Sequence, residues 1–265
     1  MKEFIRRIIL QLGYEIRHKS VSPGDPFQQQ RRLLSGIAAP VIFDVGANIG
    51  AVTERYRQLF RDAKIYAFEP FPVIFEQLER NVRHDKHVIP WMLALGNAQS
   101  KQALQVNASS PTNSLLETDE SATSFWGKGR LETTEKVDVD VTTMDQFCSE
   151  NQISHIDLLK LDTQGTERLI LEGGRQMLSA GRVGVIYTEI IVAPSYVGQS
   201  KTHELLLLLD ELGYVLYGLY NLWSLDGGRL LQMDGLFVRS DRLAGNTMIC
   251  AIGGTDKSEV DRATI

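Results

Sequence analysis

The feature that most constrains the fold is the stretch VIFDVGANIG at residues 41–50, a short apolar run that reaches an acidic residue and then breaks into glycines. Strands of a parallel sheet that helices cover on both faces are continuously apolar. The turn after such a strand brings the backbone close to a ligand, and Gly46 and Gly50 permit that approach. The stretch therefore predicts a buried strand, a ligand-binding turn and a helix.

The rest of the chain alternates between strand-like and helix-like patterns. We predict strands at 41–45, 64–68, 87–92, 137–141, 156–161 and 183–191, and helices at 27–37, 49–60, 72–82, 167–178 and 202–212. A hairpin of 214–219 and 235–238, with a turn at 226–228, is predicted to finish the sheet. This order predicts an α/β fold with a mostly parallel sheet and helices on both faces.

The length of 265 residues and the 43% hydrophobic composition favour one α/β domain over two. We assign residues 1–40 to an N-terminal helical cap, 41–240 to the main domain and 241–265 to a polar tail. Residues 107–136 are polar and irregular, which predicts a lid or substrate loop. Residues 1–19 place apolar residues at helical spacing beside basic ones, which predicts an amphipathic helix. We favour a helix that packs on its own domain over one that makes weak contact with a membrane surface.

Charge and composition exclude several classes of protein. A net charge of -5 argues against a general nucleic-acid binder, which needs a basic surface. The longest apolar run, 205–209, is too short to span a bilayer, and the first residues lack the cleavage site of a signal peptide. Cys148 and Cys250 have no CxxC or HxxxH companion, so no disulfide framework and no metal site are predicted. A soluble, cytoplasmic protein fits best.

Acidic residues end the first two predicted strands. Asn48 stands where the dinucleotide fingerprint GxGxxG has its second glycine, and Asp44 puts a negative charge where a phosphate would lie. A carboxylate suits an ammonium or sulfonium group. Glu69, which Pro70 follows, can accept both hydroxyls of a ribose. Either acid alone could simply cap a helix, but together with the glycine turn they favour S-adenosylmethionine, which carries all of these groups.

Four segments resemble FkbM-type S-adenosylmethionine-dependent methyltransferases: 43–50 (FDVGANIG), 68–70 (FEP), 94–96 (ALG) and, as the most specific, 159–167 (LKLDTQGTE). The resemblance implies a class I methyltransferase fold, a Rossmann-like sheet of seven strands with an antiparallel last strand. It implies methyl transfer to a hydroxyl of a sugar or natural product, and the runs 218–223 and 228–234 resemble members found beside polysaccharide genes. The predicted cofactor-binding residues are Asp44, Gly46, Asn48, Gly50, Glu69, Pro70, Ala94, Leu95 and Asp162.

Methyl transfer to an alcohol needs a group that takes the hydroxyl proton, because an alcohol is a poor nucleophile at neutral pH. Asp162 follows the strand 156–161, where ligands of such sheets collect, and is our first candidate base; Glu189 is the second. Lys160 shares a strand face with Asp162 and could lower its pKa or form a structural ion pair with it. The candidate acceptor-binding residues are Asn113, Ser114, Gln164, His203 and Trp223.

Three other functions agree less well with the same residues. A nicotinamide-dependent sugar reductase or epimerase could use this sheet, but Asn48 and the lack of a Tyr-x-x-x-Lys element oppose it. A non-catalytic S-adenosylmethionine-binding module would keep the fold, although the acids and glycines of a catalyst are all present. A nucleic-acid methyltransferase is disfavoured, because DTQG at 162–165 replaces the Pro-Pro-aromatic element that holds a flipped base. We expect a small-molecule or glycan acceptor.

Overall fold

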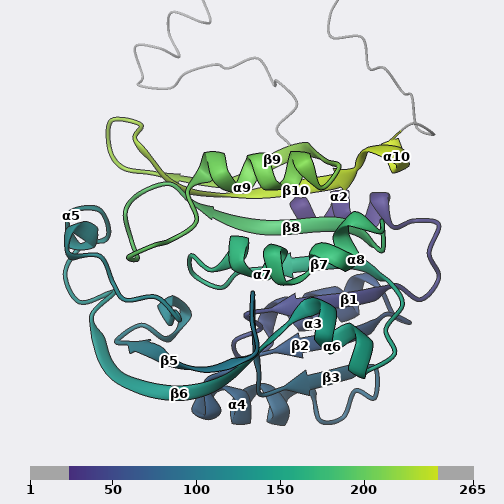
Figure 1. Ribbon diagram of the computed structural model, residues 1–265, viewed down its shortest axis with the longest axis horizontal. Coiled ribbons are helices and arrows are strands. Elements are labelled where there is room, and N and C mark those ends of the chain that lie inside the picture. The colour runs from purple at the N-terminus through teal and green to yellow at the C-terminus, as the bar shows by residue number, and fades with distance from the viewer. Residues whose placement is uncertain (1–23, 244–265) are drawn as a thin grey trace, which may run out of the picture.

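The computed structural model describes residues 24–243, and its centre is a sheet of seven strands in the order β3-β2-β1-β7-β8-β10-β9 (Figure 1). The strands are β1 (Val41–Val45), β2 (Lys64–Phe68), β3 (Val88–Trp91), β7 (Ile156–Leu161), β8 (Val183–Ile191), β9 (Tyr214–Ser224) and β10 (Leu230–Arg239). Strand β10 is antiparallel to both of its neighbours, whereas the remaining pairs are parallel. The predicted fold class is therefore confirmed.

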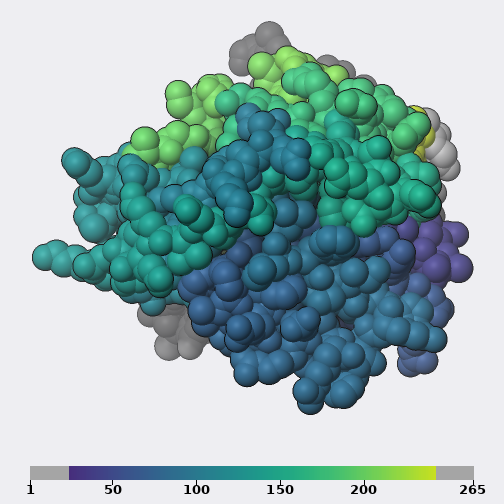
Figure 2. Space-filling view, turned by 60° about the horizontal axis from the view of Figure 1, so that its bottom comes forward, coloured from purple at the N-terminus to yellow at the C-terminus, as the bar shows by residue number. Residues whose placement is uncertain are grey.

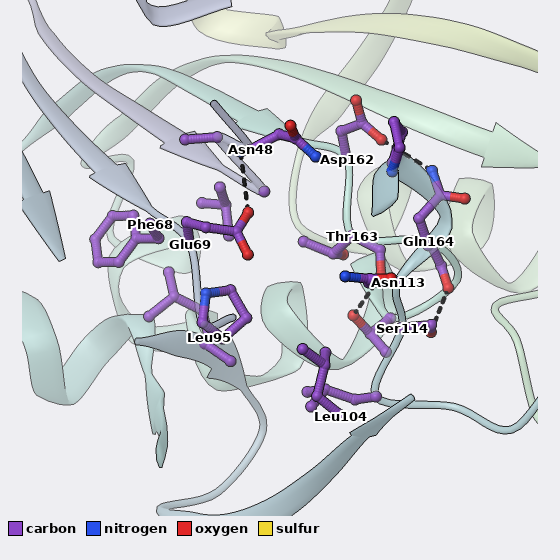
Figure 3. A pocket seen from close by; sticks show the side chains of 18 of the residues that line it. Asn48, Phe68, Glu69, Leu95, Leu104, Asn113, Ser114, Asp162, Thr163 and Gln164 are labelled. Atoms are coloured by element: carbon purple, nitrogen blue, oxygen red, sulfur yellow. Dashed lines mark hydrogen bonds between the residues drawn. The ribbon is translucent and has the colours of Figure 1, made fainter. Parts of the chain in front are cut away.

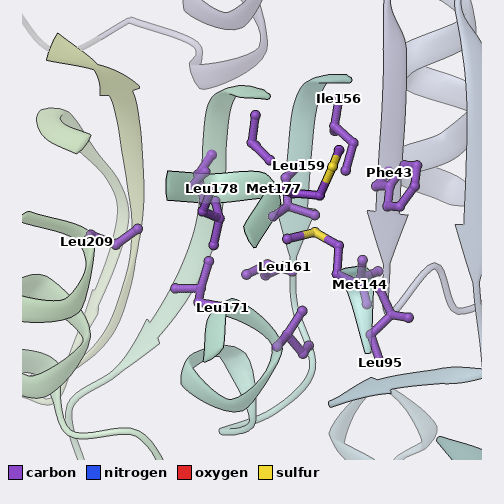
Figure 4. Packing of buried hydrophobic residues seen from close by; sticks show 14 of the residues in the cluster. Phe43, Leu95, Met144, Ile156, Leu159, Leu161, Leu171, Met177, Leu178 and Leu209 are labelled. Atoms are coloured by element: carbon purple, nitrogen blue, oxygen red, sulfur yellow. The ribbon is translucent and has the colours of Figure 1, made fainter. Parts of the chain in front are cut away.

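Helices cover both faces of this sheet, and each face has its own hydrophobic cluster. One cluster lies under α6 (Met144–Glu150), α7 (Glu167–Gly173), α8 (Arg175–Ser179) and α9 (Thr202–Glu211) (Figure 4). The other includes residues of α2 (Pro26–Leu33), α3 (Ala51–Leu59) and α4 (Pro72–Val82). Phe43 belongs to the first cluster and Ile42 to the second. Because side chains alternate along a strand, Asp44 faces the same side as Ile42.

A second, three-stranded sheet in the order β4-β6-β5 stands beside the first. It consists of β4 (Ala94–Gly96), β5 (Ser100–Asn107) and β6 (Thr133–Thr143), of which only the part 137–141 was predicted. Strand β6 pairs parallel to β4 and antiparallel to β5. In the space-filling view, the blue early part of the chain fills the lower half, and the teal and green later part fills the upper half (Figure 2).

The segment predicted as an irregular lid contains short helices: η1 (Ser110–Thr112), η2 (Glu120–Ala122) and α5 (Thr123–Trp126). It is attached to the main domain by antiparallel bridges of Ser114 with Gln105 and of Thr118 with Tyr196. The segment is thus ordered and flanked by strands, and its action as a lid stays a prediction.

The prediction of one helix at 167–178 is wrong, because α7 ends at Gly173 and α8 begins at Arg175. A Cβ on Gly173 would lie 2.0 Å from the carbonyl oxygen of Gly96, and one on Gly174 would lie 1.8 Å from Met144. Two glycines therefore let the chain turn against β4 and α6. The hairpin strands are longer than predicted. Thr143 caps α6, since its hydroxyl accepts a hydrogen bond from the N–H of Gln146 at 3.1 Å.

The predicted helix at 1–19 lies outside the described residues, as does most of the predicted tail, because the description ends in α10 (Ser240–Leu243). Between residues 24 and 243, no helix combines the length and the apolar character that crossing a membrane requires.

Candidate active site

A cavity of about 340 Å³ opens where β1, β2 and β7 end, and the second sheet and the lid segment form its other wall (Figure 3). From the main sheet it is lined by residues 45–49, 68–70 and 162–164. From the opposite side it is lined by residues 93–95, Leu104 and residues of the segment 110–115. The cavity thus lies at the carboxyl ends of the parallel strands, the edge at which ligands of such sheets bind.

The glycine turn after β1 forms one wall of this cavity. Gly46 and Gly50 have φ angles of 76° and 94°, in the left-handed region that glycine adopts without steric cost. A Cβ on Gly46 would lie 1.9 Å from the carbonyl oxygen of Asp162. The N–H groups of Gly46 and Ala47 both donate to the carbonyl of Phe68, at 3.0 and 2.9 Å. The turn is therefore held tightly between the ends of β2 and β7, and only glycine fits at position 46.

Glu69 presents its carboxylate to the cavity beside this turn. One oxygen accepts the N–H of Asn48 and the other that of Phe71, each at 3.0 Å. Burial raises the pKa of Glu69 to about 6, although the N–H groups of Phe71 and Asn48 and the charge of Lys160 lower it. Each carboxylate oxygen can accept a further hydrogen bond. Near pH 7 the ionised side chain can thus receive two neighbouring hydroxyls.

Asp44, predicted to contact the cofactor, is instead fully buried and does not line the cavity. Its Oδ2 accepts a hydrogen bond from the Thr53 hydroxyl at 2.6 Å, and its Oδ1 lies 3.0 Å from Nζ of Lys160. The same ammonium donates to the carbonyl of Gly46 at 2.8 Å. These contacts give Asp44 and Lys160 a positioning role beneath the glycine turn.

Lys160 keeps its proton in this environment. Burial lowers its pKa, but Asp44 and Asp162 raise it more, so that the net shift is upward. The side chain is only 4% exposed, and it lies 3.7 Å from a carboxylate oxygen of Asp162. A buried ammonium that remains charged orients carboxylates and is not itself a base.

A second cavity of about 210 Å³ adjoins the first, and Pro111, Asp162 and Gln164 line both. The remaining walls come from the segment 126–131, from β8 through Glu189 and Ile191, from the loop residues Ser195 and Tyr196, and from Trp223 and Gln232 of the hairpin. Asp162 therefore stands at the boundary between two spaces, each able to hold part of a bound molecule.

Gln164 connects the two candidate bases. Its Nε2 donates to Asp162 Oδ1 at 3.1 Å and to Glu189 Oε2 at 2.8 Å, and its Oε1 accepts from the Tyr196 hydroxyl at 3.0 Å. The backbone carbonyl of Gln164 accepts a hydrogen bond from Ser114 Oγ at 2.7 Å, which attaches the lid segment to this loop. The amide thus holds both carboxyl groups in position. Figure 3 shows Gln164 beside Asp162 and Ser114.

The two carboxyl groups differ in environment. Glu189 is buried, and burial, together with the nearby Asp162, Glu167 and Asp234, raises its pKa well above the usual value, against the opposing charge of Lys160. The side chain of Asp162 is 45% exposed. Burial without a bonded cation favours the neutral acid at Glu189. Glu189 is therefore the buried, neutral member of the pair, and Asp162 is the more exposed one.

Glu167 holds the loop between β7 and α7. Its Oε1 accepts hydrogen bonds from the N–H groups of Thr163 and Gly165, at 3.0 and 3.2 Å, and from the Thr163 hydroxyl at 3.1 Å. These bonds give Glu167 a structural role at the start of α7.

The other predicted residues fall into three groups. The cavity beside Glu69 is also lined by Pro70, Ala94, Leu95, Asn113 and Ser114, and the second cavity by Trp223. Gly50 lies behind the wall, where its Cβ would meet Leu78 at 2.9 Å. His203 is exposed on α9 and lines neither cavity.

A third cavity of about 310 Å³ reaches Asp162 and Glu189 from the side of Phe27 and Arg55.

Sequence reasoning missed three residues of the second cavity: Trp126, Arg130 and Tyr196. Trp126 is fixed by a hydrogen bond from its Nε1 to Ser195 Oγ at 2.7 Å, and its ring lies 6.0 Å from that of Trp223 at an interplanar angle of 82°. Trp126 and Arg130 belong to the segment 107–136, which gives no periodic signal, and they meet Trp223 only in the folded chain.

Comparison with known proteins identifies the family. Residues 44–216 match the methyltransferase FkbM domain. The chain is 28% identical over 178 residues to 2-O-methyltransferase NoeI of Sinorhizobium fredii, covering 65% of this chain and 72% of NoeI. It is 31% identical over 166 residues to methyltransferase sdnD of Sordaria araneosa, covering 51% of this chain and 60% of sdnD. Among solved structures, precorrin-6y C5,15-methyltransferase from Geobacter metallireducens is similar to this chain with a TM-score of 0.45 and 11% sequence identity. The superposition covers 84% of this chain and 91% of that protein.

The cavity residues fit S-adenosylmethionine. Gly46 has no side chain, so that its backbone is accessible from the cavity. Glu69 presents two carboxylate oxygens that can receive the hydroxyls of a ribose, and Leu95 and Leu104 form an apolar surface on which a base can pack. The family match spans more than half of the chain. The chain therefore belongs to the FkbM family of methyltransferases, whose methyl donor is S-adenosylmethionine.

Proposed function

We propose that this methyltransferase acts on a hydroxyl oxygen of a sugar or natural-product acceptor that binds in the second cavity. The observation that carries the proposal is that Asp162 and Gln164 line both cavities. A carboxylate at this boundary lies where a methyl donor and an acceptor would meet. The printed name of the relative NoeI, a 2-O-methyltransferase, supports oxygen as the atom that is methylated.

In the proposed reaction Asp162 accepts the hydroxyl proton as the new O–C bond forms. S-adenosylmethionine, when bound, would supply the sulfonium-activated methyl carbon, and as its carbon–sulfur bond broke it would leave as the neutral thioether S-adenosylhomocysteine. Gln164 holds Asp162 at 3.1 Å, and the Lys160 ammonium, 3.7 Å away, attracts its negative charge. Such positioning of a base contributes about 10²- to 10⁴-fold to the rate.

Glu189 has a different role in this proposal. Because its pKa is raised by burial, it presents a carboxylic acid, one oxygen of which accepts the hydrogen bond from Gln164. A neutral carboxyl group can donate a hydrogen bond to an acceptor oxygen. Glu189 therefore orients the acceptor, while Asp162 takes the proton.

The walls of the second cavity suit a sugar. Trp126, which is half-buried, and Trp223, which is exposed, both line this cavity. The C–H face of a sugar ring packs well on aromatic rings.

The competing hypothesis is a non-catalytic module that binds S-adenosylmethionine. The nicotinamide-dependent sugar reductase or epimerase is no longer a candidate, because the chain belongs to a family of methyltransferases.

The proposal is tested by incubating the protein with isotope-labelled S-adenosylmethionine and fractionated cell-extract sugars, with mass spectrometry of the products. A labelled methyl ether that survives mild alkali supports O-methylation of a hydroxyl, whereas an alkali-labile methyl ester or an N-methyl product contradicts it. If calorimetry shows binding of S-adenosylhomocysteine but no fraction accepts a methyl group, the non-catalytic hypothesis is correct.

A further inference from the structure

We infer that the acceptor carries an anionic group, a carboxylate or a phosphate, which binds to Arg130 at the mouth of the second cavity. This inference rests on the proposed function, because it names the chemical class of the acceptor for that site. It concerns the part of the second cavity where the lid segment meets the β9–β10 hairpin.

Arg130 lies on aromatic side chains from both of these segments. Its guanidinium carbon is 5.0 Å from the ring centroid of Trp223 and 6.0 Å from that of Trp126. All three residues line the second cavity. The hydrogen bond from Trp126 to Ser195 and the one from Thr112 Oγ1 to the carbonyl of Arg130, at 3.1 Å, fix the local chain. The guanidinium is therefore presented on a built surface.

The charge of Arg130 is not neutralised by its surroundings. Among the ion pairs formed within residues 24–243, none includes Arg130, and its side chain is exposed. Stacking on a ring leaves the edge of a guanidinium free. That edge carries paired N–H donors whose spacing matches two oxygens of a carboxylate or phosphate.

A second arginine has the same arrangement nearby. The guanidinium carbon of Arg229, in the turn between β9 and β10, lies 4.5 Å from the ring centroid of Phe125 in α5. The helix α5 and this turn lie on the same side of the molecule in both views (Figures 1 and 2). Arg130 lines the second cavity and Arg229 does not, but both guanidinium groups lie over aromatic rings of the lid segment or the hairpin. On a chain of net charge -5, two such arginines indicate a local preference for anions.

The inner end of the cavity has the opposite character. Asp162 and Glu189 lie there, and a carboxylate or phosphate placed beside them would be repelled by Asp162 and would have to be desolvated. A bound anionic sugar is therefore oriented, with its anionic group at Arg130 and a hydroxyl at Asp162. The methylated oxygen and the anionic group lie at opposite ends of the acceptor.

The test begins with the labelled product of wild-type protein and cell-extract sugars. We expect this product to be retained on an anion exchanger at pH 7. Loss of retention after phosphatase treatment identifies a phosphate, and loss after chemical reduction of carboxyl groups identifies a carboxylate. A labelled product that passes through the exchanger overturns the inference while leaving O-methylation intact, and the absence of any product with retained S-adenosylhomocysteine binding instead counts against the proposed function.

The second arm uses Arg130→Gln with Arg80→Gln as its matched control, because Arg80 is an exposed arginine on α4. Loss of a charge-assisted hydrogen bond predicts a fall of about 10- to 100-fold in kcat/KM for the acceptor in Arg130→Gln. Arg130→Lys should recover part of it, and S-adenosylhomocysteine affinity should not change in any variant. Equal kcat/KM for Arg130→Gln and Arg80→Gln overturns the inference.

Discussion

Nζ of Lys160 lies 3.0 Å from Oδ1 of Asp44, and the two side chains are 4% and 0% exposed. The residues face each other in the parallel register of β1 and β7. Because the ammonium also donates to the carbonyl of Gly46 at 2.8 Å, the pair connects the sheet to the turn that walls the cofactor cavity. A buried ion pair thus holds the backbone of the glycine turn that lines the first cavity.

Breaking this pair from one side should destabilise the fold. In Lys160→Met the Asp44 carboxylate stays buried without its cation, which predicts a loss of about 3–5 kcal/mol in the free energy of unfolding. Urea denaturation measures it. The double variant Asp44→Asn/Lys160→Met should lose less than the sum of the single variants, because the stranded charge is gone. A loss below about 1 kcal/mol in Lys160→Met would show that the pair does not stabilise the fold.

Gly46→Ala should impair cofactor binding through the backbone. Its Cβ would lie 1.9 Å from the carbonyl oxygen of Asp162, at φ 76°. Gly213→Ala is the matched control, since Gly213 has φ 83° and an added Cβ there meets nothing within 4 Å. Both variants pay about 1–2 kcal/mol for the left-handed backbone. Titration calorimetry should show at least a tenfold loss of S-adenosylhomocysteine affinity in Gly46→Ala alone; equal affinities refute the close-approach argument.

Cofactor affinity should depend on pH through Glu69. Burial raises its pKa to about 6, so that the carboxylate, which we propose accepts the ribose hydroxyls, becomes protonated as the pH falls through that value. If binding requires the ionised form, affinity for S-adenosylhomocysteine falls by up to about tenfold per pH unit below 6 and is constant above 7. Glu69→Gln should bind more weakly at pH 7, without this dependence. Wild-type affinity that stays constant between pH 5 and 7 would contradict the role.

Gln164→Leu should affect turnover more than binding. The substitution removes the two hydrogen bonds, at 3.1 and 2.8 Å, that hold Asp162 and Glu189. A misplaced base predicts a fall of about 100-fold in kcat. The affinity for S-adenosylhomocysteine should stay within about threefold, because the amide contacts carboxyl groups at the cavity boundary. A parallel loss of cofactor affinity would place Gln164 in the cofactor site instead.

The central sheet was predictable because each buried strand has a local signature, an apolar run followed by glycine or acidic residues. Strands β4 and β5 were not, since both pair with β6, as in Ala94 opposite Val141, and β4 has only three residues. Such pairing leaves no periodic pattern in either strand. The same applies to the break between α7 and α8, which depends on contacts of Gly173 and Gly174 with distant segments.

Within the site, Asp162, Gln164 and Glu189 were predicted as candidates, and the structure brings them together. The direction of Asp44 could not be predicted, because a strand that is apolar on both faces does not reveal which face an acid occupies. His203 is exposed because the buried positions of α9, Leu205, Leu208 and Leu209, lie on the opposite face of the helix.

The most direct test of the central claim measures methyl transfer by Asp162→Asn. Asparagine keeps the shape of the side chain but cannot take a proton, so turnover should fall by about 10²- to 10⁴-fold. S-adenosylhomocysteine affinity should stay within about tenfold of wild type. His203→Ala, at an exposed position of α9, should retain the wild-type rate. Turnover near the wild-type rate in Asp162→Asn would contradict its role as the base, and an equal loss of cofactor binding would assign Asp162 to the cofactor site.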